Sequence, residues 1–183
     1  MATTGSQQDS AILCALALAM VNHPRASLQE LARAVGVSKA TLYRFCRTRE
    51  QLVERLLEYS IDTMRGALEQ AQLDSGAPHE ALQRLAVLFL EHRELAAFLT
   101  YYWKDAGAEL AESTHMEDQL DAFFLHGQQQ GIFRIDFSAA ALTEIWLSIF
   151  VGLADAERRG RVARAGLAAQ VNRAFLHGAQ ADT

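Results

Sequence analysis

Proline, cysteine and strand-like patterns are scarce in this chain of 183 residues, and these absences narrow the choice of fold. Two prolines occur, Pro24 and Pro78, so little interrupts the long stretches rich in Ala, Leu, Glu and Arg. No stretch alternates apolar and polar residues for long enough to indicate a β-sheet. Half of the residues are apolar, which is enough for one large or two small helical domains with real cores. The sequence therefore predicts an all-α fold.

Patterns that mark common catalytic and metal sites are also missing. The six histidines include no pair four residues apart, the spacing that brings two imidazoles to one metal ion on a helix. There is no G-x-S-x-G nucleophile turn and no glycine-rich phosphate loop. The acids Glu117, Asp118 and Asp121 follow His115, but such a run is more typical of a solvated helix face than of a metal site. We therefore predict that the chain is not an enzyme and needs no metal or cofactor.

Targeting signals are not apparent either. The apolar run from Ala11 to Val21 has no basic segment before it, because the first Lys or Arg is Arg25, and it is too short to span a bilayer. Cys14 and Cys46 form no metal-binding or redox motif, which suits a reducing compartment. We expect a cytoplasmic protein without membrane association, with this apolar run as its first helix.

The stretch from residue 27 to residue 57 is, by contrast, dense in helix-boundary signals. Ser27 and Glu30 have the spacing of a capping box, in which each side chain binds the backbone of the other residue. Gly36 then interrupts the helical pattern, and glycine accepts the left-handed backbone that a sharp turn between crossed helices requires. Ser38 follows as the cap of a second helix. Two short helices around such a turn predict a helix-turn-helix.

A third helix start, marked by Thr48 and Gln51, completes this pattern. If Leu42 points into the core, the polar residues beside it lie on the outward side of the second helix, whose N-terminal half would meet base edges in DNA. Arg47 and Arg49 lie at the third helix start, where free N–H groups and the helix dipole favour a phosphate. The predicted DNA-binding residues are Ser38, Lys39, Ala40, Thr41, Tyr43, Arg44, Phe45, Arg47 and Arg49.

At these residues the chain resembles the TetR family of bacterial transcriptional regulators. The segment GVSKATLYRFCRTREQL is similar to the recognition segment of that family, G-V-S-x-G-T-L-Y-x-Y/H-F-x-x-K-E-x-L. The resemblance implies an N-terminal three-helix DNA-binding domain and a larger helical domain that dimerises and binds an effector. It also implies DNA contacts for Thr41, Tyr43 and Arg49.

Four residues depart from the family pattern: Ala40 stands for Gly, Phe45 for Tyr or His, Cys46 for Phe, and Arg49 for Lys. Arginine in place of lysine keeps the expected phosphate contact. Phe45 has no hydrogen-bond donor, so we expect it to offer van der Waals contact, for example to a thymine methyl group. Cys46 leaves less volume filled in the small core, so a neighbour is expected to be bulkier than usual.

Charge is unevenly distributed along the chain, whose net charge is -5. Residues 1–55 carry seven Lys or Arg and four Asp or Glu, a net charge of +3, which leaves −8 for the remainder. Positive charge is thus concentrated where contact with DNA phosphates is predicted.

The remaining boundary signals predict about nine helices in two domains, a helix-turn-helix domain at 1–50 and a helical-bundle effector-binding and dimerisation domain at 51–183. A long helix is expected from Arg49 to about Gln72. Further helices are expected at 78–91, 94–103, 107–130, 139–158 and 162–177. The helix at 139–158 is apolar almost all round, so we expect the last two helices to form the seam of a homodimer.

Aromatic residues of the second domain supply a candidate effector site, with Glu144 as a carboxylate in an otherwise apolar helix. Aromatic walls with one acid suit a small apolar, aromatic or cationic molecule. The alternatives are core packing for the aromatic residues, and solvent or a hydrogen bond across the dimer seam for Glu144. The aromatic candidates are Phe98, Tyr101, Tyr102, Trp103, Phe123, Phe133, Trp146 and Phe150.

Together these features predict a homodimeric regulator of the TetR type, most simply a repressor that leaves a palindromic double-stranded DNA operator when its small-molecule effector binds. Two alternatives stay open from the residues themselves. One is a helical-bundle enzyme. The other is a protein-interaction module whose helix-turn-helix no longer reads DNA, for which Ala40, Phe45 and Cys46 leave room.

Overall fold

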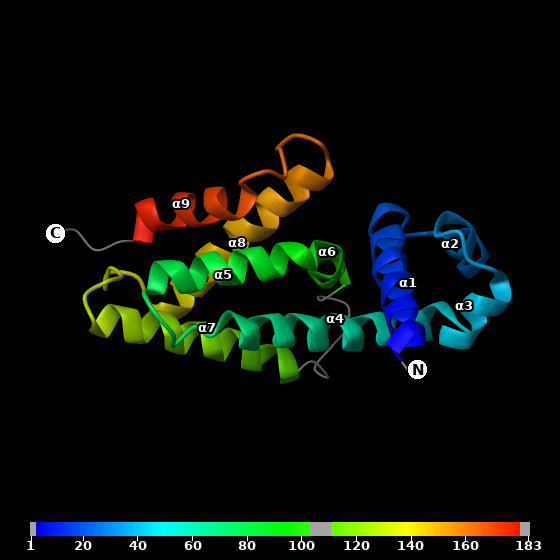
Figure 1. The fold of residues 1–183 in the computed structure, drawn as a ribbon, viewed down its shortest axis with the longest axis horizontal. Coiled ribbons are helices and arrows are strands. Elements are labelled where there is room, and N and C mark those ends of the chain that lie inside the picture. The colour runs from blue at the N-terminus through cyan, green and yellow to red at the C-terminus, as the bar shows by residue number, and fades with distance from the viewer. Residues whose placement is uncertain (1–2, 103–110, 180–183) are drawn as a thin grey trace. The chain divides into compact units, whose positions relative to one another are not determined.

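The structure is a computed structural model that describes residues 3–102 and 111–179, and these residues form nine helices and no β-sheet (Figure 1). The predicted all-α fold is thereby confirmed. The helices are α1 (Thr3–Asn22), α2 (Leu28–Ala34), α3 (Lys39–Phe45), α4 (Arg49–Ala71), α5 (Pro78–Glu91), α6 (Arg93–Tyr102), α7 (Ala111–Gln129), α8 (Ala139–Arg158) and α9 (Leu167–Ala179).

The chain divides into two compact units whose boundary does not follow the order of the helices. One unit comprises Met1–Met64 and His92–Gly107, and the other comprises Arg65–Glu91 and Ala108–Thr183. The helix-turn-helix unit therefore includes α6 as well as the first two-thirds of α4. The predicted division at residue 50 falls inside α4, and as a division of function it stays a prediction.

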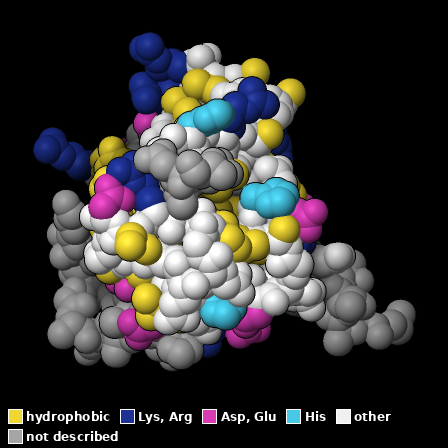
Figure 2. Space-filling view, turned by 90° about the vertical axis from the view of Figure 1, so that its left-hand side faces the viewer, with side chains coloured by type: hydrophobic (Ala, Val, Ile, Leu, Met, Phe, Trp, Pro, Cys, Tyr) yellow, Lys and Arg dark blue, Asp and Glu magenta, His cyan; other side chains and the backbone are white. Residues whose placement is uncertain are grey.

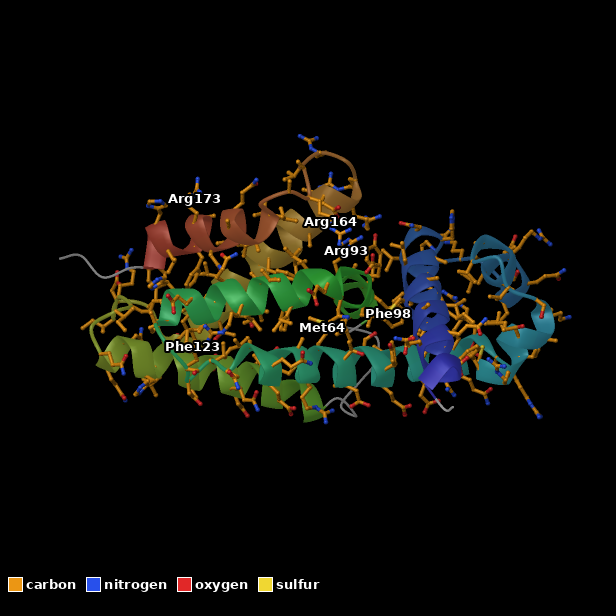
Figure 3. The ribbon with its side chains drawn as sticks, viewed as in Figure 1. Met64, Arg93, Phe98, Phe123, Arg164 and Arg173 are labelled. Carbon is orange, nitrogen blue, oxygen red and sulfur yellow. The ribbon has the colours of Figure 1, made fainter. Side chains whose placement is uncertain are left out.

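In the first unit, α1 packs against α6 and α2, and α2 packs against α3. Met64 of α4 and Phe98 of α6 are both buried in this unit (Figure 3). Burial of these aliphatic and aromatic side chains provides the main favourable free energy that holds the short helices in place. The largest fully buried side chains of the unit are Leu16, Met20, Leu31, Leu42, Leu52, Leu56 and Phe98.

In the second unit, α8 packs against α7 and α9, and α9 also packs against α5. Aromatic rings fill its core in two clusters. One joins Phe123, Phe124, Phe133 and Phe175, with neighbouring ring centroids 5.1–6.3 Å apart. The other joins Phe89, Trp146 and Phe150, in which the last two rings stack at 5.8 Å. Edge-on and stacked rings of this kind add to the stabilisation from burial.

Local signals account for most of the helix boundaries. Helices α5 and α8 have the predicted bounds, because Pro78 suits the first helical position and the Ser138 side chain accepts the N–H of Ala141 at 3.1 Å. Helix α9 begins at Leu167 and not near residue 162, so that prediction was wrong. Gly160 and Gly166 both have φ values near +75°, at 72° and 76°, and this left-handed backbone breaks the helical pattern between them.

Gly127 of α7 leaves room for the ring of Phe133, which gives a direct test of this packing. A Cβ atom at Gly127 would overlap Cδ2 of the Phe133 ring, whereas one at Gly66 of α4 would meet nothing within 4 Å. We expect Gly127→Ala to lower the free energy of unfolding by about 1–3 kcal/mol through overpacking. The matched Gly66→Ala should raise it by up to about 1 kcal/mol. Urea unfolding of the two variants measures the difference, and equal shifts would contradict the packing described.

Candidate nucleic-acid interface

The first helix of the motif begins at a complete capping box, as predicted. The backbone N–H of Glu30 donates to Ser27 Oγ at 3.3 Å, and the N–H of Ser27 donates to Glu30 Oε2 at 2.8 Å. These bonds from the backbone and hydroxyl of Ser27 lower the pKa of the Glu30 carboxyl group. The carboxylate form therefore fixes where α2 begins at neutral pH.

A single left-handed residue turns the chain between α2 and α3. Gly36 has φ = 72°, and the N–H of Val37 donates to the carbonyl of Ala32 at 2.9 Å across the turn. A side chain at this φ would be strained, so glycine is required by the backbone rather than by space, since nothing lies within 4 Å of a Cβ there. The turn aims α3 away from α2 while Leu31 and Leu42 are both fully buried.

Two further caps position α3 and α4. Ser38 Oγ accepts the N–H of Thr41 at 3.0 Å. At α4, Thr48 Oγ1 accepts the N–H of Gln51 at 3.2 Å, while Gln51 Oε1 accepts the N–H of Arg47 at 2.9 Å. The return bond goes to Arg47 rather than to Thr48, one residue earlier than in the predicted capping box. Both helix starts are nevertheless fixed by side chains, which matters because a seven-residue helix such as α3 is marginal alone.

The outward side of α3 presents the residues that were predicted to meet DNA. Lys39, Ala40 and Arg44 are exposed, and Tyr43 is 41% exposed despite its size. Lys39 Nζ lies 5.3 Å from the centre of the Tyr43 ring, so the cation and the ring share one patch. Arg44 Nη2 lies 2.7 Å from Asp9 Oδ1 of α1, a solvent-exposed ion pair that is open to exchange for a phosphate.

Phe45 and Cys46 do not face outward. Phe45 is 7% exposed, with the guanidinium groups of Arg44 and Arg55 each 5.3 Å from its ring centre, so the structure does not offer its ring to a thymine methyl group. Cys46 is buried, and burial raises the pKa of its thiol. Phe45 therefore belongs to the small core, so its prediction as a DNA-binding side chain is not supported by its burial, and the expectation of a bulkier neighbour for Cys46 stays a prediction.

The two arginines near the start of α4 point in different directions. Arg47 is exposed, as a phosphate-binding residue should be. Arg49 is half-buried, and its Nη2 donates to the carbonyl of Pro24 at 2.5 Å and to the hydroxyl of Tyr102 at 3.2 Å. The structure thus turns the guanidinium group of Arg49 towards the protein, where sequence reasoning expected it to face DNA.

The predicted effector residues are spread over both units. Phe98 and Tyr102 stack at 4.5 Å in the first unit, Tyr101 is exposed on the same helix, and Trp103 lies outside the described residues. In the second unit the four buried candidates are divided between its two aromatic clusters, and Phe123 can be found in Figure 3. Those four are Phe123, Phe133, Trp146 and Phe150. Phe89, Phe124 and Phe175 also belong to these clusters, although they were not among the predicted effector residues.

Glu144 is exposed and belongs to an acidic group on α7 and α8. Burial raises the pKa of Glu117, and the negative charges of Glu144, Asp121 and Asp118 raise it further. Asp121 Oδ1 accepts the hydroxyl of Thr143 at 2.5 Å, which joins the two helices. Mutual repulsion within this group favours a cation, but no cluster of three metal-ligating side chains occurs among the described residues.

A groove of about 640 Å³ runs between α5 and α9 in the second unit. It is lined by His79, Glu80, Gln83, Arg84, Ala169, Asn172, Arg173, Leu176 and His177. In the view of Figure 2, Lys and Arg side chains lie mostly toward the top, Asp and Glu side chains lie mostly below them, and His and apolar side chains lie among them.

Comparison with known proteins points to one class. Residues 24–56, which span the helix-turn-helix and the start of α4, match the family model described as bacterial regulatory proteins, tetR family. The chain is 46% identical over 175 residues to the HTH-type transcriptional regulator NfxB of Pseudomonas aeruginosa, covering 93% of this chain and 94% of that protein.

Similarity to LfrR, an HTH-type transcriptional repressor of Mycolicibacterium smegmatis, is 33% over 91 residues, half of this chain and 48% of that protein. The crystal structure of LfrR in complex with proflavine superposes with a TM-score of 0.71 at 22% identity, covering 94% of this chain and 96% of that one. The regulator PfmR of Thermus thermophilus has a TM-score of 0.68 at 26% identity, covering 91% and 94%.

Proposed function

The chain belongs to the TetR family of bacterial regulatory proteins and is a DNA-binding transcriptional regulator, and we propose that it is a repressor released from a palindromic operator by a small-molecule effector. The observation that carries the proposal is the exposed side of α3. Helix α3 is short and begins at the Ser38 cap, just after the left-handed turn at Gly36. Its exposed side carries Lys39, Tyr43 and Arg44. Base-edge contact would come from this side of α3, with Ser38, Ala40 and Thr41 at its N-terminal end.

Contact with phosphates is assigned to Arg47 and Arg44. Both are exposed, and the first lies beside the start of α4, where the helix dipole adds positive potential. The net charge of +3 in residues 1–55 would steer this part of the chain to DNA, whereas the acidic remainder would not attach to it.

Dimer formation through α8 and α9 is supported by how little of α8 the single chain covers. By length and composition alone α8 is apolar enough to cross a membrane, yet 22% of that stretch is buried. Its buried side chains are Leu142, Thr143, Trp146 and Phe150, and Ile145 on another side is 36% exposed. An apolar helix with a free face is stabilised by a second copy of the same chain, which would place two α3 helices on one operator.

A regulator of this kind works in the cytoplasm.

The effector would be a flat aromatic or cationic molecule bound in the second unit. The acidic side chains Glu117, Asp121 and Glu144 supply negative charge, and the aromatic clusters lie in the same unit. LfrR has been crystallised with proflavine, a compound of this chemical kind. Release requires only that the effector bind one shape of the dimer more tightly than the shape that fits the operator.

DNA binding is tested by titrating the double-stranded DNA upstream of the chain's own gene at several salt concentrations. Arg47→Ala should weaken binding and lower the slope of log affinity against log salt by about one, because one phosphate contact is lost. Tyr43→Ala should weaken binding to this DNA with little change of slope. Arg164→Ala, which removes an exposed arginine from the connection between α8 and α9, is the matched control and should bind as the unchanged chain does. Equal slopes for Arg47→Ala and the control would remove Arg47 from the phosphate contacts.

The dimer seam is tested by placing a charge on α8. We expect Ile145→Glu to convert a dimer into a monomer at micromolar concentration, because a carboxylate would be buried without a partner. Ile135→Glu is the control, since Ile135 is 82% exposed in the connection between α7 and α8. Sedimentation velocity measures both masses. A dimer that survives Ile145→Glu, or a native chain that is already monomeric, would argue against this seam.

The effector class is tested with proflavine as a flat cationic probe. Binding to the folded state should raise the melting temperature and lower the affinity for DNA. Neutralising acids with Glu117→Gln and Glu144→Gln should reduce both effects, whereas Glu91→Gln, an exposed acid of α5, should leave them unchanged. If all three variants respond alike, the acidic group of α7 and α8 does not bind the cation.

A further inference from the structure

Arg49 and Tyr102 form a hydrogen-bonded pair that reaches from the first residue of α4 to the last residue of α6. Arg49 Nη2 donates to the Tyr102 hydroxyl at 3.2 Å, and that hydroxyl in turn donates to the carbonyl of Met20 at 3.3 Å. A phenolic group has one proton to give and accepts others, so both bonds are satisfied at once. The same Arg49 nitrogen donates to the carbonyl of Pro24 at 2.5 Å.

The bond between Arg49 and Pro24 joins the two ends of the helix-turn-helix, and we call this contact the closure. Pro24 lies just before α2 and Arg49 lies just after α3, so the segment 24–49 contains the whole reading motif. Met20, near the end of α1, and Tyr102, at the end of α6, fix the closure to the body of the first unit. A displacement of either end would tilt α3, because α2 and α3 are short and share one turn.

The closure is held rigidly from the α6 side. The Tyr102 ring stacks on Phe98 at 4.5 Å with an interplanar angle of 22°, and Phe98 is fully buried. The hydroxyl group is thus presented at a fixed point. Arg49 Nη1 is also buried, so the guanidinium group faces the protein. A phosphate that binds Nη2 would have to displace the carbonyl of Pro24 or the hydroxyl of Tyr102.

We propose that Arg49 and Tyr102 are positioning residues for DNA recognition, and that Arg49 is not a phosphate ligand. The Tyr102 hydroxyl, which lies 46 residues beyond the end of the matched family model at residue 56, sets how well α3 fits its operator. The proposal rests on DNA binding by α3, and it assigns that function a determinant outside the helix-turn-helix.

Salt dependence separates positioning from phosphate contact. Tyr102→Phe keeps the ring stacked on Phe98 and removes only the hydroxyl group, while Arg49→Ala removes the whole donor. Each should weaken binding to the upstream DNA about tenfold, the typical effect of losing a hydrogen bond to a charged group, with an unchanged salt slope. The effects of the two changes should be less than additive in the double variant, because both remove the Arg49–Tyr102 bond, although Arg49→Ala also removes the bond to Pro24 and Tyr102→Phe the bond to Met20. Arg47→Ala is the control that does lower the slope.

Two outcomes overturn the proposal: Arg49→Ala lowering the slope by about one, as Arg47→Ala does, or Tyr102→Phe binding DNA as tightly as the unchanged chain. A readout without DNA distinguishes failure of the proposal from failure of the DNA-binding function. Amide hydrogen exchange of segment 24–49 should become faster in Tyr102→Phe, while exchange in α8 stays the same. An unchanged exchange rate in segment 24–49 would contradict the positioning role even if the chain binds no DNA. Thermal melting checks that the variants are folded.

Discussion

The helix-turn-helix of this protein depends on one residue with a left-handed backbone, Gly36. The helices on either side of it have seven residues each, too few to be stable alone. Their direction is set by the turn, and their ends are fixed by the side chains of Ser27 and Ser38. The exposed patch on α3 has a defined shape because these local bonds and the buried Leu42 fix its orientation. The motif is thus already ordered in the absence of DNA, so DNA binding does not include the free-energy cost of ordering it.

Helix boundaries that depend on neighbouring residues could be predicted from the sequence, whereas contacts between residues far apart in the chain could not. Pro78 and Ser138 fixed the starts of α5 and α8 within the sequence itself. The predicted start of α9 was too early in the chain. The residues before Gly166 are rich in Ala, a good helix former, and no local signal showed that Gly166 has a left-handed backbone. The direction of Arg49 depends on Tyr102, 53 residues away, and no local pattern carries that information.

The candidate sites divide in the same way. The outward residues of α3 follow from one buried position, Leu42, and helical geometry, so their exposure was predictable apart from Phe45. Phe45, which was also predicted to meet DNA, follows Leu42 at a spacing of three residues, so the same helical geometry places it on the buried face of α3. The effector residues depend on how distant helices meet. Aromatic content alone could not separate core rings from lining ones, and the structure divides those that it describes among separate clusters.

The proposed repressor requires a symmetric pair of α3 helices that lie in the major groove of one duplex. A hydroxyl-radical footprint on the DNA upstream of the gene measures this directly. Two protected stretches related by a two-fold axis and about one helical turn apart are the predicted result. Protection of a single stretch, or none at a concentration at which the chain is folded and dimeric, would contradict it.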